Sequence, residues 1–434
     1  MKESGAKAAL SVFGAGLPAT LLSTVLTAAA GAAASIVLAR TLSPPERGEL
    51  ATVLVWPFAV GILGELGLGL AFSYFVARDR SLLSGLWTLG WIVSLGWGTA
   101  LALASGFVLE RSLALSSPAR DAFTWTLATV PIALATAFQS YLLLGTGELA
   151  AFNVVRAGAV ALYAAGVCGI AFRGRGTITS YAAAWVVSQA LTFAIATAWL
   201  VLLRRPGWEW RAALFRPVAV YGAKTWVSGL TATMTLRLDQ ILMTALGASA
   251  VLGVYVVAVS VASLTTPLFT ALAVVVMHRA QGGASAEAGR RVLEYLQLAF
   301  LLGVPASLLV AAVSPWLVPA VFGAPYRGAV LPAAVLLLAS VFQGSNAVLG
   351  NGLRALGLPG RPARAEAAGF VLTLGLLALL LPRFGATGAA AASLLAYGAV
   401  TVIQTFFLCR SSGLSARELW AIEPRRFGAL LRGK

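Results

Sequence analysis

Long apolar segments follow one another along the whole chain, separated by short gaps that hold most of the charged residues. A helix needs roughly 20 apolar residues to cross the hydrocarbon core of a membrane. Segments of about this length predict twelve spans, at 12–39, 50–77, 82–109, 121–144, 150–172, 178–203, 217–246, 250–277, 292–313, 329–353, 365–381 and 386–409. Only helices and closed barrels satisfy their backbone hydrogen bonds in lipid. The pattern therefore predicts an all-α polytopic membrane protein.

Composition and charge agree with this class. The chain is 59% hydrophobic and 11% charged, whereas a soluble domain carries about 25% charged residues. A net charge of +16 is typical of nucleic-acid binding, but twenty of the 31 lysines and arginines fall in alternate gaps or termini, eight in the other gaps and three inside spans. This bias predicts that both termini are cytoplasmic and that nucleic acid is not a partner.

A weak internal repeat divides the chain. Ile36–Leu50 aligns without gaps on Ile241–Tyr255 at an offset of 205 residues, which places Gly48 on Gly253. Six spans per half make the two halves parallel, and in transporters of this kind the substrate site lies between the halves. We therefore expect two parallel six-helix lobes around a central cavity. The predicted domains are an N-terminal lobe at 1–205, a C-terminal lobe at 206–409 and a basic amphipathic cytoplasmic tail at 410–434.

The seventh span carries a stripe of polar residues. On a continuous helix, Lys224, Ser228, Thr231, Thr235 and Asp239 fall within roughly 80° of one another. One interpretation is the wall of a substrate cavity, and the alternative is a helix–helix seam in which small polar residues act as glue. The two charges favour the cavity, because charges inside a membrane are costly and line water-filled paths. Asp239 is also a candidate for ion coupling.

Other in-span polar residues are further candidates. Asn153 and Arg156 share one face near the start of the fifth span, where Arg156 either holds an anion or extends to the interface. Glu65 lies mid-span among glycines that indicate close packing or a bend, and its carboxylate either titrates for ion coupling or pairs with an arginine. Arg40 ends the first span and is positioned to guard the outer mouth. Arg237 points away from the stripe of the seventh span and has lower weight as a ligand.

The tenth span is unusually polar. Gln343 and Asn346 lie beside glycines there, which is typical of a broken or pore-facing helix, and both are candidate substrate ligands.

The sequence carries no sign of catalytic chemistry. It lacks the GxxxxGK[ST] nucleotide-binding signature, a metal-binding motif and a nucleophile–base pair. Its 15 acidic residues are thinly scattered, and its two cysteines lie in apolar spans. We therefore expect no cofactor, no metal and no enzymatic activity.

Three segments together resemble the polysaccharide-export branch of the multidrug/oligosaccharidyl-lipid/polysaccharide exporter superfamily, which contains the O-antigen and capsule lipid-linked oligosaccharide flippases. The likeness covers nearly the whole length. The segments that carry it are IVLARTLSPPERGELATVLVWPFAVGILGELGLGLAFSYFVAR at 36–78, YGAKTWVSGLTATMTLRLDQILMTALGASAVLGVYVVA at 221–258 with its Asp239, and SPWLVPAVFGAPYRGAVLPAAVLLLAS at 314–340 with Phe322, Gly323 and Tyr326.

The resemblance implies a V-shaped pair of lobes that opens alternately to either side of a prokaryotic cytoplasmic membrane. The implied cargo is a polyprenyl-diphosphate-linked glycan, with Lys224 and Arg156 as candidate ligands of the diphosphate. Implied partners are membrane lipids, a glycan polymerase and glycosyltransferases. Two alternatives stay open: a cation-coupled multidrug or small-molecule antiporter of the same superfamily, and a non-catalytic component of a glycan-assembly complex.

Overall fold

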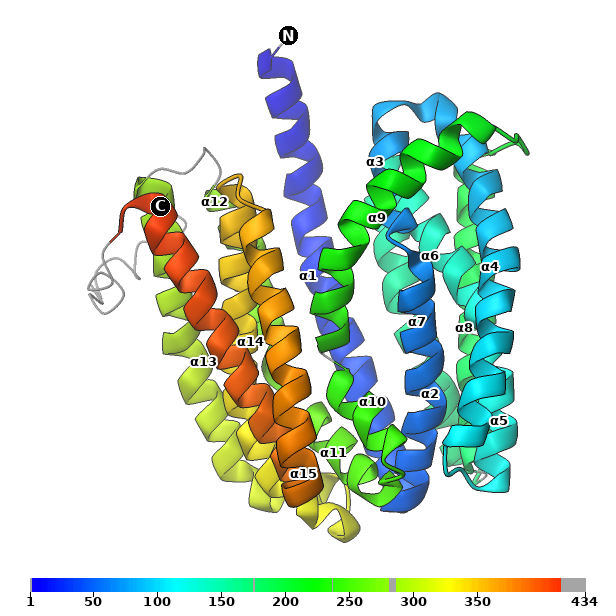
Figure 1. Ribbon diagram of the computed structural model, residues 1–434, viewed down its shortest axis with the longest axis vertical. Coiled ribbons are helices and arrows are strands. Elements are labelled where there is room, and N and C mark those ends of the chain that lie inside the picture. Colours follow the sequence, from blue (N-terminus) through cyan, green and yellow to red (C-terminus); the bar gives the residue numbers. More distant parts are fainter. Residues whose placement is uncertain (1, 175, 236, 281–285, 415–434) are drawn as a thin grey trace. The chain divides into compact units, whose positions relative to one another are not determined.

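The computed structural model describes residues 2–174, 176–235, 237–280 and 286–414, with the side chains of 2–21, 227–233 and 278 left out. Every regular element in these ranges is a helix (Figure 1), which confirms the all-α class. The α-helices are α1 (Lys2–Thr41), α2 (Pro44–Glu65), α3 (Leu68–Arg78), α4 (Leu83–Ser112), α5 (Ser117–Leu127), α6 (Val130–Gly145), α7 (Leu149–Phe172), α8 (Ile178–Arg204), α9 (Ala212–Thr235), α10 (Leu238–Ala245), α11 (Ser249–Ala262), α12 (Thr266–Arg279), α13 (Ala286–Val321), α14 (Val330–Ala355) and α15 (Gly360–Ser412). Short 3-10 helices are η1 (Arg80–Leu82), η2 (Ser263–Thr265) and η3 (Ala324–Ala329).

The helices are those of a polytopic membrane protein. Within the described residues, nine helical stretches are long and apolar enough to cross a membrane, and the bent pair α5 and α6 makes a tenth. The predicted number of twelve is not confirmed. One reason is that α15 combines two predicted spans across a kink, and another is that the predicted span 217–246 is divided between α9 and α10.

The kink in α15 lies where the sequence predicts a boundary between spans. Gly385 has φ 54° and ψ −133°, a conformation that glycine adopts readily and other residues rarely do. Pro382, three residues earlier, also removes a backbone hydrogen bond. The predicted spans 365–381 and 386–409 therefore meet at a real interruption of the helix.

Internal contacts divide the chain into two compact units. The first comprises Met1–Leu230 and Gln240–Gly253, and the second comprises Thr231–Asp239 and Val254–Lys434. The lobe boundary between residues 205 and 206 stays a prediction. The predicted tail begins in the last turn of α15, and its residues 415–434 lie outside the described part of the chain.

Helix α14 is central to the second unit. It packs against α12, α13 and α15, and α13, α14 and the end of α15 lie side by side (Figure 1). Their shared core includes the fully buried side chains of Val276, Ala299, Leu349 and Leu408. This packing fixes the helix faces that form the cavities described below.

Within the first unit, α2 and the first turn of α11 cross at the two glycines that the predicted repeat aligns. A Cβ atom on Gly48 would lie 1.7 Å from the carbonyl oxygen of Ser249, and one on Gly253 would lie 1.9 Å from the carbonyl oxygen of Pro44. Pro44 and Ser249 are also 205 residues apart. The contact is therefore reciprocal, and small residues of this kind let helix backbones approach closely in membranes.

Candidate functional site

The second unit contains a polar cavity of about 220 Å³. It brings together Asp239 and Gln343, which the sequence predicts as an ion-coupling residue and a substrate ligand. Arg237 lines the same cavity, although on a continuous helix its side chain would point away from the polar stripe. The polar and charged lining residues are Arg237, Asp239, Ser263, Thr266, Ser340, Gln343, Ser393 and Tyr397.

A break in the helix determines how Asp239 is placed. Helix α9 ends at Thr235 and α10 begins at Leu238, so the predicted stripe from Lys224 to Asp239 does not lie on one continuous helix, and that part of the prediction is wrong. Asp239 instead lies in the first turn of α10. Backbone N–H groups and the helix dipole favour a negative charge at such a position.

The Asp239 side chain is buried, with 5% of its surface exposed. The hydroxyl of Tyr255, a fully buried residue of α11, donates a hydrogen bond to its carboxylate. A buried charge is retained in a folded protein when hydrogen bonds and favourable dipoles stabilise it. Asp239 is therefore a buried, hydrogen-bonded carboxyl group at the wall of a cavity large enough for water molecules or a small cation.

The two predicted ligands on α14 differ in their surroundings. Gln343 is exposed and lines the cavity, whereas Asn346 is 7% exposed and joins α14 to α15. The Asn346 amide nitrogen donates to the carbonyl oxygen of Tyr397 at 3.0 Å, and its amide oxygen accepts from the Thr401 hydroxyl at 2.7 Å. These bonds engage the Asn346 amide in helix packing, and its role as a substrate ligand stays a prediction.

Replacing Asn346 with alanine is expected to destabilise the protein by about 1–3 kcal/mol, because a buried helix–helix hydrogen-bond pair is lost. Thermal unfolding of the purified protein in detergent measures the effect. Gln343→Ala on the same helix is the matched control, with an expected change within about 0.5 kcal/mol. Equal effects of the two substitutions would contradict the packing role of Asn346.

In the first unit, a sharp break separates α2 from α3 directly after Glu65. Leu66 and Gly67 both adopt left-handed backbone conformations, with φ 51° and 67°. A Cβ atom on Gly69 would lie 2.5 Å from Oε1 of Glu65 and 2.2 Å from the ring of Tyr141. The glycines thus provide both features that the sequence indicates, a bend and close packing around the carboxylate.

The turn of α9 that carries Lys224 packs against this break. A Cβ atom on Gly67 would lie 2.2 Å from the carbonyl oxygen of Gly222, and Trp226 donates from Nε1 to the carbonyl oxygen of Ile62 at 3.5 Å. Lys224 itself is exposed. The structure therefore places two predicted site residues, Glu65 and Lys224, on elements that contact each other.

The remaining candidates lie on several helices. On α7, Asn153 is buried, whereas Arg156 is exposed with its guanidinium carbon 5.9 Å from the ring centroid of Phe152. Arg40 is exposed in the last turn of α1. Thr235 is buried at the end of α9. The other two predicted ligands, Ser228 and Thr231, lie on α9 with side chains outside the described part of the structure.

Sequence reasoning missed the tyrosine and the serines that line the polar cavity in the second unit. Ser393, Tyr397, Thr401 and Gln404 occur at positions i, i+4, i+8 and i+11 of α15, which is the spacing of one helix face. A search for polar residues that share one helix face, which identifies the stripe in the seventh span, also identifies this stripe in the twelfth span. Among the described residues, no cluster of three or more His, Cys, Asp and Glu is arranged to hold a metal ion.

Comparison with known proteins places these features in context. Residues 37–331 match the model of a family described as polysaccharide biosynthesis protein. A search of curated protein sequences gives no match.

Several solved structures share the fold at low sequence identity. The inward-facing conformation of a multidrug resistance MATE family transporter of the MOP superfamily is 15% identical, with a TM-score of 0.71 and coverage of 90% of this chain and 97% of that one. Lipid II flippase MurJ in the inward closed conformation is 13% identical, with a TM-score of 0.70 and coverage of 92% and 89%. A MOP superfamily transporter from Pyrococcus furiosus is 14% identical, with a TM-score of 0.61 and coverage of 91% and 94%.

Proposed function

The chain belongs to the family of polysaccharide biosynthesis proteins, and from this premise we propose that it moves a polyprenyl-diphosphate-linked oligosaccharide from the inner to the outer leaflet of the cytoplasmic membrane. Its fold is shared with transporters of the MOP superfamily, which supports transport rather than catalysis as the activity in this proposal. The observation that carries the proposal is the family match over 37–331 on such a fold. The fold supports a transport activity, and the family description supports a polysaccharide precursor as the cargo.

The cationic side chains within predicted spans fit an anionic cargo. Lys224 and Arg156 are exposed on α9 and α7 of the first unit, where a charge that faced only hydrocarbon would cost roughly 2.5–3.5 kcal/mol. In our proposal both line the path of the diphosphate. The remaining proposed substrate ligands are Asn153, Ser228, Thr231, Thr235, Asn346, Gln343 and Arg40.

Two driving forces are available for transport. An inside-negative membrane potential moves anions outward with roughly 2.3 kcal/mol per charge per 100 mV. Coupling to an inward cation flow would add to this force, and Asp239 and Glu65 are the proposed coupling residues. Asp239 is the stronger of the two, because it is buried beside a polar cavity and hydrogen-bonded by Tyr255.

In this proposal, the protein resides in the cytoplasmic membrane of a prokaryote with both termini in the cytoplasm. The excess of lysine and arginine on that side supports this orientation. Glycosyltransferases that build the cargo and a polymerase that consumes it are the proposed partner enzymes.

A cation-coupled antiporter of small molecules is the second candidate function. The cavity that contains Asp239 and Tyr397 supports it, because a carboxylate and an aromatic ring suit organic cations, whereas Arg237 in the same lining opposes them. This candidate predicts that the protein confers resistance to cationic drugs when it is expressed in a sensitive strain.

Complementation of a strain that lacks its own glycan flippase tests the proposal. Wild type is expected to restore surface glycan, and Lys224→Ala and Arg156→Ala are each expected to lower it at least tenfold at matched expression, since one charge-assisted hydrogen bond contributes roughly 1.5–3 kcal/mol. Arg173→Ala, at the exposed end of α7, is the control and is expected to remain active.

The other outcomes are also informative. Full activity of both variants would support the flippase function but would show that Lys224 and Arg156 are not ligands of the cargo. Failure of the wild type, combined with drug resistance gained on expression, would reject the flippase in favour of the antiporter.

A further inference from the structure

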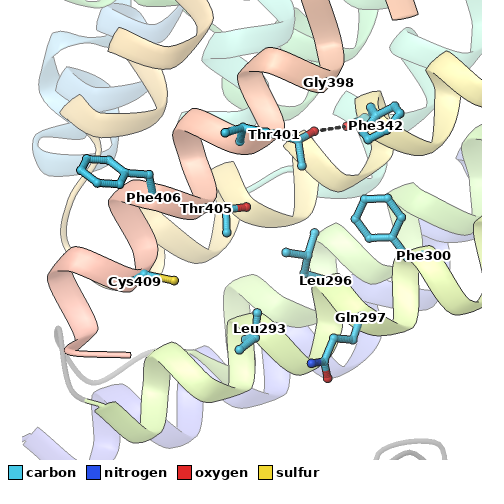
Figure 2. Close-up of a pocket in the computed structure, with 11 residues that line it drawn as sticks. Leu293, Leu296, Gln297, Phe300, Phe342, Gly398, Thr401, Thr405, Phe406 and Cys409 are labelled. Atoms are coloured by element: carbon cyan, nitrogen blue, oxygen red, sulfur yellow. Dashed lines mark hydrogen bonds between the residues drawn. The ribbon is translucent and has the colours of Figure 1, made fainter. Parts of the chain in front are cut away.

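A second cavity in the second unit is apolar and forms a groove of about 420 Å³ between α13, α14 and the end of α15 (Figure 2). It is distinct from the polar cavity, because the two share no lining residue. One wall consists of Leu293, Leu296 and Phe300 on α13, and Phe406 contributes to the other wall.

The far wall is a single face of α15. Gly398, Thr405 and Cys409 lie on it at helical spacing, and Figure 2 shows their side of the helix directed toward α13 and Phe342. Three of the eleven lining residues, Gln297, Thr401 and Thr405, have polar side chains, and the Thr401 hydroxyl is engaged because it donates to the amide oxygen of Asn346 at 2.7 Å. The groove therefore favours a hydrocarbon ligand over a polar one.

The length of the groove matches one leaflet of a membrane. From Gly398 to Cys409 the helix rises about 16 Å at 1.5 Å per residue. This is close to half of the roughly 30 Å of hydrocarbon in a bilayer. A ligand that fills the groove would thus be one hydrocarbon chain that extends from the headgroup region to the bilayer centre.

Positive charge gathers at the end of the groove where α13 begins and α15 ends. These two ends are packed together, because a Cβ atom on Gly289 would lie 2.2 Å from Oγ of Ser412. Arg290 precedes the lining residue Leu293 by one helical turn, and Arg410 follows the lining residue Cys409. Both arginines are exposed. An anionic headgroup above the groove would therefore meet two guanidinium groups, which bind phosphate well.

We propose that the groove binds one acyl chain of an anionic phospholipid, with the phosphate of its headgroup held between Arg290 and Arg410. In the predicted orientation these arginines face the cytoplasmic leaflet, where anionic lipids attract basic residues. The site is independent of the proposed cargo, since it requires only a membrane that contains anionic lipid.

Native mass spectrometry of the delipidated full chain tests the site. The probes are phosphatidylglycerol and phosphatidylcholine with identical acyl chains. Wild type is expected to retain one phosphatidylglycerol molecule with roughly 30-fold preference over phosphatidylcholine, because each of the two arginines contributes roughly 1 kcal/mol at an anionic membrane surface. The double variant Arg290→Gln, Arg410→Gln is expected to lose the preference, and the matched double variant Arg327→Gln, Arg383→Gln is expected to keep it.

A second variant fills the groove itself. A Cβ atom on Gly398 meets nothing within 4 Å, so Gly398→Leu occupies the groove without disturbing the packing and is expected to lose the bound lipid. Gly375→Leu is the control, because Gly375 is an exposed glycine of α15 whose added Cβ also meets nothing within 4 Å. If Gly398→Leu lowers the melting temperature, Thr405→Phe replaces it.

Three results would overturn the proposal. The first is equal retention of the two phospholipids by the wild type. The second is unchanged lipid retention in a folded groove-filling variant. The third is displacement of phosphatidylglycerol by equimolar polyprenyl phosphate, which would assign the groove to a carrier lipid.

Discussion

Gly48→Leu is expected to prevent the accumulation of folded protein in the membrane. Even the Cβ atom of the new side chain would lie 1.7 Å from the carbonyl oxygen of Ser249, and backbone cannot move aside as a flexible side chain can. Overpacking of an ordinary core costs about 1–3 kcal/mol. A clash with backbone on this scale is expected to exceed that range, and it approaches the whole stability of a typical domain, roughly 5–15 kcal/mol.

Size-exclusion chromatography of a fluorescent fusion in detergent measures the folded fraction. Gly61→Leu is the matched control on the same helix, because a Cβ atom there meets nothing within 4 Å. Gly253→Leu is expected to fail as Gly48→Leu does, since its Cβ atom would lie 1.9 Å from the carbonyl oxygen of Pro44. A monodisperse peak for Gly48→Leu at the level of Gly61→Leu would show that α2 and α11 do not cross at this point.

Asp239→Ala is expected to produce the second large effect, a loss of both stability and transport. The substitution leaves the buried Tyr255 hydroxyl without the carboxylate to which it donates. Hydrogen bonds to charged groups contribute about 1.5–3 kcal/mol, so a loss of at least that size is expected in thermal unfolding. Tyr255→Phe is expected to cost a similar amount, and the double variant less than the sum of the two.

Asp239→Asn separates the structural role of this residue from the proposed coupling role. Its amide oxygen still accepts from Tyr255, so we expect the variant to fold, but it cannot exchange a proton or neutralise a cation. Transport into inverted membrane vesicles is expected to lose its dependence on an imposed proton or sodium gradient. Glu65→Gln is the parallel variant for the other coupling candidate. Unchanged gradient dependence in a folded Asp239→Asn protein would remove Asp239 from the coupling mechanism.

The apolar pattern predicted the fold well because lipid imposes a simple constraint on it. Segments of about 20 apolar residues become helices wherever they occur. Breaks marked by glycine or proline were also readable, as at Gly67 and Gly385. The break between Thr235 and Leu238 cannot be predicted in this way, because the sequence TLRLD at 235–239 contains neither glycine nor proline. The pattern therefore predicts one straight helix through this region, with Lys224 and Asp239 on the same stripe.

The site was predicted only in part, for a related reason. Charged residues inside spans are conspicuous, so Asp239 and Glu65 were found from their cost in lipid. Tyr397 and Ser393 cost little at a helix interface and were overlooked, although they line the cavity beside Asp239. Burial of Asn346 in contact with α15 depends on the tertiary packing of two helices, which no pattern in one of them reveals.

The reciprocal contact at Gly48 and Gly253 has a consequence for the origin of the chain. Gly48 lies against the carbonyl group of Ser249, which is four positions before Gly253. In the same way, Gly253 lies against the carbonyl group of Pro44, which is four positions before Gly48. This is the signature of an isologous interface, in which the same patch on two identical subunits contacts itself across a two-fold axis. A gene for a subunit that formed a homodimer through this patch would, on duplication and fusion, give a single chain with this crossing already in place.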